Sequence, residues 1–250
     1  MQRLVLFIVL FTTGLFSQAQ DYGFLQKSQE YKLDQFDQNV GLNNPFVNTI
    51  NQADNGNLIV GTGEGVGVFD GKHFEMYYTD DHLAENYISS SFKDDSGNVW
   101  LGHQAGGVSI FDGVSFDLVH PGGGINSAIN DIDQDENGLI WFAAKDFGLF
   151  NVNEQGKCEF FNNQFEGQYL HSFMITKDGF FFVGTDAGVD VYKYYEEEKI
   201  LSKVQGVSGI PRDQVAGISE VSTGKIVVST FTSGLYLIEK KNDVFLTSKI

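Results

Sequence analysis

The sequence contains little cysteine, proline, methionine or arginine, and these shortages exclude several classes of protein. Cys158 is the only cysteine among 250 residues, so the chain has no internal disulfide, cysteine-rich zinc cluster or paired redox site. We expect Cys158 to be a half-buried strand residue. Arg3 and Arg212 are the only arginines, and the formal net charge is −17. Because affinity for nucleic acid scales with lysine and arginine contacts to phosphate, we exclude nucleic acid as a partner.

Long apolar runs are also missing, except at the N-terminus. Arg3, the apolar run Leu4–Phe16 and the stretch Ser17–Ala19 resemble a secretory signal with its cleavage site. A membrane anchor is the weaker alternative because the run is shorter than the ~20 residues that a span needs. We therefore predict a signal peptide over residues 1–19 and a periplasmic or extracytoplasmic location. Cleavage of this signal peptide would remove Arg3 and change the formal net charge from −17 to −18.

Helical periodicity is absent from the longer segments of the chain. The stretch Tyr194–Val204 is the one place where a short helix competes with a solvated strand or loop, and we favour the latter. In contrast, 29 glycines, 23 phenylalanines and 10 tyrosines suit tight turns between aromatic-rich strands. The composition therefore favours an all-β protein.

A β-hairpin sequence motif recurs five times along the chain. Its turn glycines are spaced 41, 41, 41 and 45 residues apart and are Gly56, Gly97, Gly138, Gly179 and Gly224. A small residue follows each of them five positions later, namely Gly61, Gly102, Ala143, Gly184 and Ser229. A fixed period of this length indicates a supersecondary unit that buries its apolar face only by stacking on copies of itself.

Each repeat is predicted to contain four short antiparallel strands. In the first repeat these are Val47–Ala53, Leu58–Thr62, Gly65–Phe69 and His73–Tyr78, joined by Asn-Gly and Asp-Gly turns. The second repeat reproduces the outer pair as Val108–Phe111 and Ser115–Val119. Four-stranded antiparallel units of this kind are the blades of a β-propeller.

We divide the mature chain into a leading segment, residues 20–41, and five blades. The blades are predicted at residues 42–82, 83–123, 124–164, 165–208 and 209–250. Tyr31–Phe36 reads as the outer strand of a closing blade, yet the fifth repeat has its own outer strand in Asp243–Lys249. We therefore expect an N-terminal part of a larger propeller of about seven blades, with a self-contained five-bladed ring as the alternative.

The repeat also resembles a known family. The residues that carry the resemblance are Gly41-Leu42 with Val47 and Ile50, Gly61-Thr62 with Phe69-Asp70-Gly71, Trp100-Leu101-Gly102 with Phe111-Asp112-Gly113, Gly184-Thr185 with Gly188-Val189, and Gly209-Ile210-Pro211 with Val215 and Ile218. This pattern, over residues 31–249, resembles the two-component regulator propeller repeat. His103 and Ala143-Ala144 depart from its Gly-Thr element, and the fourth and fifth copies lack its Asp-Gly.

The resemblance implies a periplasmic, ligand-sensing propeller of a bacterial sensor histidine kinase or hybrid two-component protein. We expect any kinase part to lie outside this chain, and therefore expect a non-catalytic binding module with no cofactor. Further expectations are a homodimer in the full receptor and membrane attachment only through a downstream segment. The alternative is a secreted carbohydrate-binding protein or a carbohydrate-active lyase or hydrolase.

Several motifs that resemble metal-binding or catalytic motifs are better explained as parts of the repeat. Asp133–Gly138 matches the start of a calcium loop, but Trp141 and Ala144 stand where later acidic ligands are needed, so we favour a hairpin turn. The stretch from Asp95 to Trp100 resembles the structural Asp-box turn of sialidases. The five histidines lack metal-ligand spacing and are expected to be surface or strand residues; they are His73, His82, His103, His120 and His171.

Geometry nevertheless predicts where a propeller of this kind binds a ligand. Loops between the second and third strands, and connectors between blades, emerge on one face and vary from copy to copy. The former supply Glu64, His103, Gln104, Lys145, Asp146, Asp186 and Thr230, and the latter supply Asp81, His82, Glu85, His120, Tyr169 and Arg212. By analogy with the family, acids, amides and aromatics there suit a small molecule or oligosaccharide, and we predict no metal.

Overall fold

The computed structural model describes residues 35–250 apart from 123, 154–155, 166–167, 205–206, 208 and 242–243. Residues 36–250 form one unit. The expected signal peptide and all but the end of the expected strand Tyr31–Phe36 lie outside the described residues. Among the described residues, no helix is both long and apolar enough to cross a bilayer.

The described chain folds into five four-stranded antiparallel sheets, which confirms the all-β prediction. The first consists of β1 (Val47–Gln52), β2 (Leu58–Thr62), β3 (Gly65–Phe69) and β4 (Phe74–Tyr77). The second consists of β5 (Ile88–Lys93), β6 (Val99–His103), β7 (Val108–Phe111) and β8 (Phe116–Val119). The third consists of β9 (Ile129–Gln134), β10 (Ile140–Ala144), β11 (Gly148–Val152) and β12 (Cys158–Phe161). Cys158 is a half-buried strand residue, as predicted.

The last two sheets follow the same order. The fourth consists of β13 (Leu170–Ile175), β14 (Phe180–Thr185), β15 (Gly188–Tyr195) and β16 (Ile200–Lys203). The fifth consists of β17 (Val215–Ser222), β18 (Lys225–Thr230), β19 (Gly234–Lys241) and β20 (Val244–Lys249). Three short 3₁₀ helices lie in connecting segments, η1 (Gln38–Val40), η2 (Thr79–Asp81) and η3 (Asn163–Phe165). The stretch Tyr194–Val204 is a strand hairpin rather than a helix, and β20 confirms the outer strand expected in the fifth repeat.

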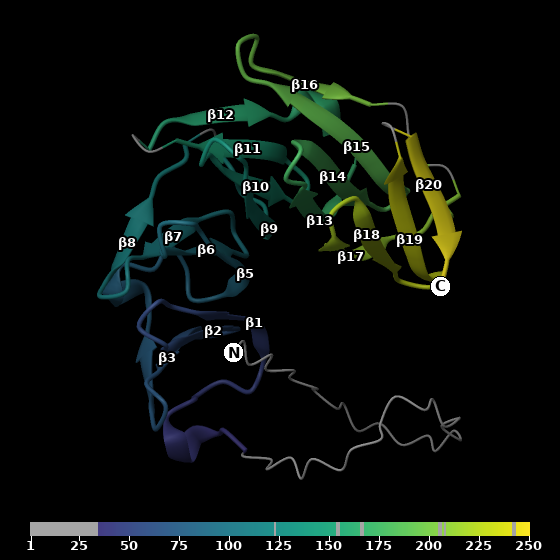
Figure 1. Cartoon of the computed structure of the whole chain (residues 1–250). Helices are drawn as coiled ribbons and strands as arrows, with labels where there is room; N and C mark the ends of the chain where they lie inside the picture. The colour runs from purple at the N-terminus through teal and green to yellow at the C-terminus, as the bar shows by residue number, and fades with distance from the viewer. Residues whose placement is uncertain are drawn as a thin grey trace, which may run out of the picture. The chain divides into compact units, whose positions relative to one another are not determined.

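Successive sheets meet through their first strands. Strands β1, β5, β9, β13 and β17 are neighbours in that order, and in Figure 1 they lie on the inner side of the arc that the sheets form. The fourth strand of each sheet lies on the outer side. This arrangement is the stacking of blades that the repeat predicted.

The small residue of each repeat allows the sheets to approach closely. A Cβ atom on Gly61 would lie 2.6 Å from Ile88, and one on Gly102 would lie 2.6 Å from Ile129. Ile88 and Ile129 open the first strands of the following sheets and are fully buried. Glycine is therefore present where the next sheet packs against the backbone, because a side chain would force the sheets apart.

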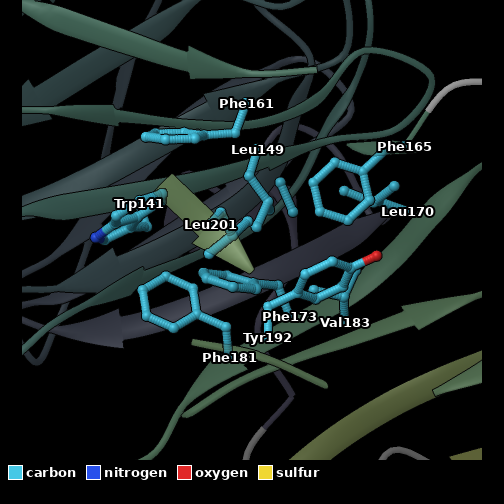
Figure 2. Close-up of a cluster of buried hydrophobic side chains, with 11 residues drawn as sticks. Trp141, Leu149, Phe161, Phe165, Leu170, Phe173, Phe181, Val183, Tyr192 and Leu201 are labelled. Carbon is cyan, nitrogen blue, oxygen red and sulfur yellow. The ribbon is translucent and has the colours of Figure 1, made fainter. Parts of the chain in front are cut away.

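The hydrophobic core is divided into clusters between neighbouring sheets. Figure 2 shows the cluster between the third and fourth sheets, where Trp141 and Phe161 of one sheet face Phe181 and Tyr192 of the other. The Trp141 and Phe181 rings meet edge to face at 4.8 Å. Aromatic pairs of this kind add about 0.5–1.5 kcal/mol to the gain from burial, so the phenylalanine-rich composition stabilises the junctions between sheets.

Polar side chains join the same sheets at one edge. Asn48 Nδ2 donates to the Ile88 carbonyl at 2.8 Å, and Ser89 Oγ donates to the Ile129 carbonyl at 2.7 Å. Asn130 Nδ2 repeats the contact with the Leu170 carbonyl at 2.7 Å. In the fourth sheet the corresponding residue is His171, which makes different contacts.

The segment before the first sheet continues the repeat. Helix η1 precedes the first sheet as η2 precedes the second, and the Phe36 ring packs on Phe74 at 6.1 Å as the Tyr77 ring packs on Phe116 at 5.0 Å. Phe36 therefore takes the place of an outer-strand aromatic from a preceding sheet. Assignment of Tyr31–Phe36 to an outer strand stays a prediction.

Candidate functional site

One edge of the sheets carries both kinds of loop proposed for binding. The first strand of every sheet begins there, and the second strand ends there. We call this edge the rim, and define it as the connector before each first strand together with the loop between the second and third strands. The residues before the strands are Phe46, Tyr87, Ala128, Tyr169 and Gln214.

Backbone hydrogen bonds hold the two parts of the rim together. The Gly63 amide donates to the Phe46 carbonyl at 3.1 Å, and the Lys145 amide donates to the Ala128 carbonyl at 2.8 Å. The same bond joins Gln104 to Tyr87 and Phe231 to Gln214. The loops of the first, second, third and fifth sheets are therefore fixed relative to the neighbouring strand, while their side chains are free to differ.

The threonine of the Gly-Thr element closes the loop between the second and third strands. Thr62 Oγ1 donates to the Gly65 carbonyl at 2.9 Å and accepts the Glu64 amide at 3.0 Å. Thr230, a predicted site residue, makes the equivalent bonds to the Gly234 carbonyl and the Ser233 amide and is buried. Its hydroxyl group is thus used inside the turn instead of facing a ligand.

His103 occupies the threonine position in the second sheet, and its ring is fully buried. Its Nε2 atom lies 2.9 Å from Ser109 Oγ, and that oxygen also accepts the Ala84 amide at 2.9 Å. Burial lowers the pKa of His103 to about 4, which keeps the ring neutral. The structure therefore corrects the expectation that His103 faces a ligand on the open rim.

The remaining predicted residues are exposed, but they are spread along the rim. They are Glu64 in the first sheet's loop, His82 and Gln104 around the second sheet, His120 before the third, Lys145 and Asp146 in the third, Asp186 in the fourth and Arg212 before the fifth. His120 borders a cavity of about 460 Å³, which is also lined by Leu83, Ala84, Gly106, Gly107, Leu118, Val119, Pro121, Gly122, Gly124 and Ile125.

The third to fifth sheets bring a group of functional side chains together, which we call the rim cluster. His171 Nε2 lies 2.6 Å from Asp186 Oδ1, and Gln214 Nε2 lies 3.3 Å from His171 Nδ1. Lys145 Nζ lies 5.6 Å from the centre of the Tyr169 ring, and the Lys145 carbonyl accepts the Leu170 amide. Cation, aromatic ring, imidazole, carboxylate and amide thus share one stretch of the rim.

Aromatic side chains recur at one rim position. Phe46, Tyr87 and Tyr169 all stand just before a first strand, and their exposed fractions are 71%, 41% and 49%. Exposure of three large rings at equivalent positions is not explained by packing of the sheets. Sequence reasoning named Tyr169 but missed Phe46 and Tyr87, although their 41-residue spacing was a signal for them.

Two aspartates that resemble ligands are structural. Trp100 Nε1 donates to Asp94 Oδ2 at 2.8 Å, and Trp141 Nε1 donates to Asp135 Oδ2 at 2.8 Å. The turn that resembles an Asp-box is therefore held by Asp94, which stands just before the stretch Asp95–Trp100 that carries the resemblance. Gly138 lies in the β9–β10 hairpin, as predicted.

Comparison with known proteins gives a fold and no family. No family model matches the sequence, and no curated protein matches it. Among solved structures, the extracellular domain of a hybrid two-component system from B. thetaiotaomicron aligns at 19% identity with a TM-score of 0.68, covering 86% of this chain and 32% of that one. The chain thus spans about a third of that domain.

Other similar structures have different roles. Virginiamycin B lyase from Staphylococcus aureus aligns at 14% identity with a TM-score of 0.64, covering 80% of this chain and 69% of the lyase. PorZ, a surface component of the type-IX secretion system of Porphyromonas gingivalis, aligns at 16% identity with a TM-score of 0.63, covering 81% of this chain and 33% of PorZ. At these identities the comparisons show a propeller-type fold shared by sensors, surface proteins and enzymes.

Proposed function

We propose that this chain is an extracytoplasmic, ligand-sensing propeller module of a two-component receptor, and that it binds its ligand on the rim without catalysis. The rim cluster carries the proposal, because polar and aromatic groups meet there at exposed or half-buried positions that the fold does not require. The resemblance of the repeat to two-component regulator propellers and the similarity to a sensor's extracellular domain support the same function.

The composition of the rim favours a neutral, hydroxyl-rich ligand. Exposed rings such as Tyr169 offer flat apolar surfaces, while Asp186 and Gln214 offer acceptors and donors for hydroxyl groups. The net charge of −17 opposes the approach of anions. We therefore propose a neutral oligosaccharide or a small polyol as the ligand.

Calorimetric titration of the chain from residue 20 with neutral, anionic and cationic oligosaccharides tests this proposal. We expect binding of a neutral sugar and a loss of at least tenfold in affinity in Tyr169→Ala and Asp186→Asn, equivalent to about 1.4 kcal/mol. Asp117→Asn is the matched control, because Asp117 is exposed on β8 away from the rim. Absence of binding across the panel, or equal affinity in all four proteins, would remove the rim as the site.

The wider receptor is part of the same proposal. Export by residues 1–19, further blades and a downstream membrane helix with a kinase are the features that a sensor needs. Sequencing the transcript beyond the codon for Ile250 tests this directly. Detection of a membrane helix and kinase in the same reading frame supports the sensor, and their absence favours the second candidate.

A secreted carbohydrate-active enzyme is that second candidate, and the His171–Asp186 pair favours it. A carboxylate 2.6 Å from an imidazole orients the ring and supports acid–base chemistry. Similar propellers include a lyase. Mass spectrometry of the sugar panel after incubation tests the point: cleaved or unsaturated products that disappear in His171→Asn would establish an enzyme, and intact sugars would favour the sensor.

A further inference from the structure

Exposed aromatic rings lie on the rim, one on each of four sheets. They are Phe46, Tyr87 and Tyr169, directly before β1, β5 and β13, and Phe231, directly after β18. Their exposed fractions are 71%, 41%, 49% and 75% in that order. Within the part of the chain that the structure describes, none of the four packs on another ring, whereas the exposed ring of Phe160 does. The rim rings are therefore not needed for the packing of the sheets.

The preceding sheet holds two of these rings in equivalent places. Gly63 directly follows β2 and Lys145 directly follows β10, so the two residues occupy the same position of the loop. A Cβ atom on Gly63 would lie 3.8 Å from the Tyr87 ring, and Lys145 Nζ lies 5.6 Å from the centre of the Tyr169 ring. Each ring therefore lies beside the loop of the sheet before it, where it presents a flat apolar surface at the junction.

The third and fifth sheets vary this pattern. Ala128 stands before β9 and is buried, while the loops of the second and third sheets carry the exposed side chains of Gln104 and Lys145. In the fifth sheet Gln214 takes the place of the ring before the first strand, and the Phe231 amide donates to the Gln214 carbonyl at 2.8 Å. Flat apolar surfaces therefore alternate with polar side chains along the rim.

The rings follow the order of the sheets. Strands β1, β5, β9, β13 and β17 lie next to one another in that order along the inner side of the arc (Figure 1). Stacked sheets pack about 10 Å apart, so the Tyr87 and Tyr169 rings, which belong to the second and fourth sheets, are separated by on the order of 20 Å. A single sugar unit or a small polyol reaches one ring at this spacing, whereas a linear chain of units reaches both.

We propose that the rim binds a linear, neutral oligosaccharide that extends across the second, third and fourth sheets and contacts Tyr87 and Tyr169 with the same chain. This rests on the proposed function and narrows its ligand from sugars and polyols in general to extended chains. Sugar units stack their C–H faces on the two rings, and Gln104 between them offers a donor and an acceptor to hydroxyl groups. Contact with the second ring is intramolecular once the first is occupied, so the rim selects ligands by length.

Calorimetric titration of the chain from residue 20 with neutral, linear gluco-, manno- and galacto-oligosaccharides tests the length dependence. For the series that binds, we expect the affinity to rise at least about tenfold between a two-unit and a six-unit chain. Tyr87→Ala and Tyr169→Ala are each expected to remove this rise and to lower the affinity for the six-unit chain about tenfold. Tyr195→Ala is the matched control, because Tyr195 is 48% exposed at the end of β15 away from the rim.

Phenylalanine variants separate stacking from hydrogen bonding by the tyrosine hydroxyl. Phe46 shows that phenylalanine occupies this rim position, so Tyr87→Phe and Tyr169→Phe are expected to keep the affinity for the six-unit chain within about twofold. The length dependence of the wild type needs no variant, so it decides the question even where an alanine variant fails to fold.

Two results would overturn the extended ligand and leave the rim as a site for a small one. The first is a bound series with equal affinity for the two-unit and six-unit chains. The second is a rise with length that survives in Tyr87→Ala and Tyr169→Ala alike. Absence of binding by every oligosaccharide is a different outcome, because it removes the proposed function together with this inference.

Discussion

At the scale of single residues, the hairpins between first and second strands depend on a few buried polar atoms. Asp135 is an example, because one oxygen accepts the Leu139 amide at 3.0 Å and the other accepts Trp141 Nε1 at 2.8 Å. The Trp141 ring is fully buried, so its N–H group has no access to water when the carboxylate is removed. In the preceding repeat the residue equivalent to Asp135 is Asp94. The next residue, Asp95, is also an aspartate, but its side chain is exposed.

Replacement of these two aspartates separates their roles. We expect Asp135→Ala to lower the free energy of unfolding by about 1–3 kcal/mol, because it leaves a buried donor without a partner. Asp95→Ala is expected to change it by less than about 0.5 kcal/mol, as is usual for exposed positions. Urea denaturation followed by tryptophan fluorescence measures both. Equal losses in the two variants would contradict the assignment of the turn to the buried aspartate.

His103 makes a second prediction at this scale. Its pKa is lowered to about 4 by burial, so the neutral ring stabilises the fold fully above the ordinary value of 6.5 and progressively less as the pH falls toward about 4. His103→Thr, which restores the threonine of other repeats, is expected to remove this loss. Comparing the unfolding free energies of wild type and variant across that range isolates the contribution of His103, because all other titrating groups are shared by the two proteins. A difference that is constant with pH would contradict the prediction.

At the scale of elements, the connectors before the first two sheets share one conformation, a 3₁₀ helix that ends in a left-handed residue. Gly41 ends η1 with a φ of 95°, and His82 ends η2 with a φ of 70°. The left-handed conformation is therefore a property of the connector, and the first copy uses glycine for it. A histidine in this conformation costs roughly 1 kcal/mol, because its Cβ atom crowds the backbone.

Glycine at the second connector is expected to stabilise the protein. His82→Gly relieves the strain, partly offset by the greater freedom of glycine in the unfolded chain, and we expect a net gain of about 0.5 kcal/mol. His120→Gly, at an exposed position outside the left-handed region, is expected to be neutral or destabilising. Thermal unfolding of the two variants provides the comparison. A lower melting temperature in His82→Gly would show that the histidine side chain contributes a contact that outweighs the strain.

At the scale of the whole described unit, equivalent residues differ in burial according to whether a sheet precedes them. Ile88, Ile129, Leu170 and Val215 open the first strands of the second to fifth sheets and are fully buried. Val47 opens the first sheet at the same position and is 41% exposed. The sequence pattern is the same in each case, so the difference arises from the neighbouring sheet alone.

Truncation of two equivalent residues measures this difference. Ile88→Ala is expected to lower the free energy of unfolding by about 2–5 kcal/mol, because it leaves a cavity between two sheets. Val47→Ala is expected to cost less than about 1 kcal/mol, because water already reaches the side chain. Urea denaturation of both variants gives the comparison. A large loss in Val47→Ala would indicate that a further element covers this face in solution.

Much of the fold followed from local patterns. Asn-Gly and Asp-Gly turns and alternating β-formers located β2 and β3 at their observed bounds, and the small residue after each turn marked the close approach of the next sheet. Hairpins are local in sequence, so turn chemistry and strand propensity decide them. Topology also predicted which loops share the rim, since it follows from counting antiparallel strands.

The candidate site was less accessible to sequence reasoning, because it is built from contacts between sheets. His171 meets Asp186 within one sheet and Gln214 from the next, and the Asp131 and Asp133 carboxylates reach a strand 42 residues away. His103 looked like a loop residue but is enclosed by its neighbours. Such contacts depend on the offset and spacing of stacked sheets, which the packing of large side chains sets. The sequence by itself therefore determined the repeat, its strands and its turns, and the tertiary structure decided which polar groups are enclosed, paired or exposed.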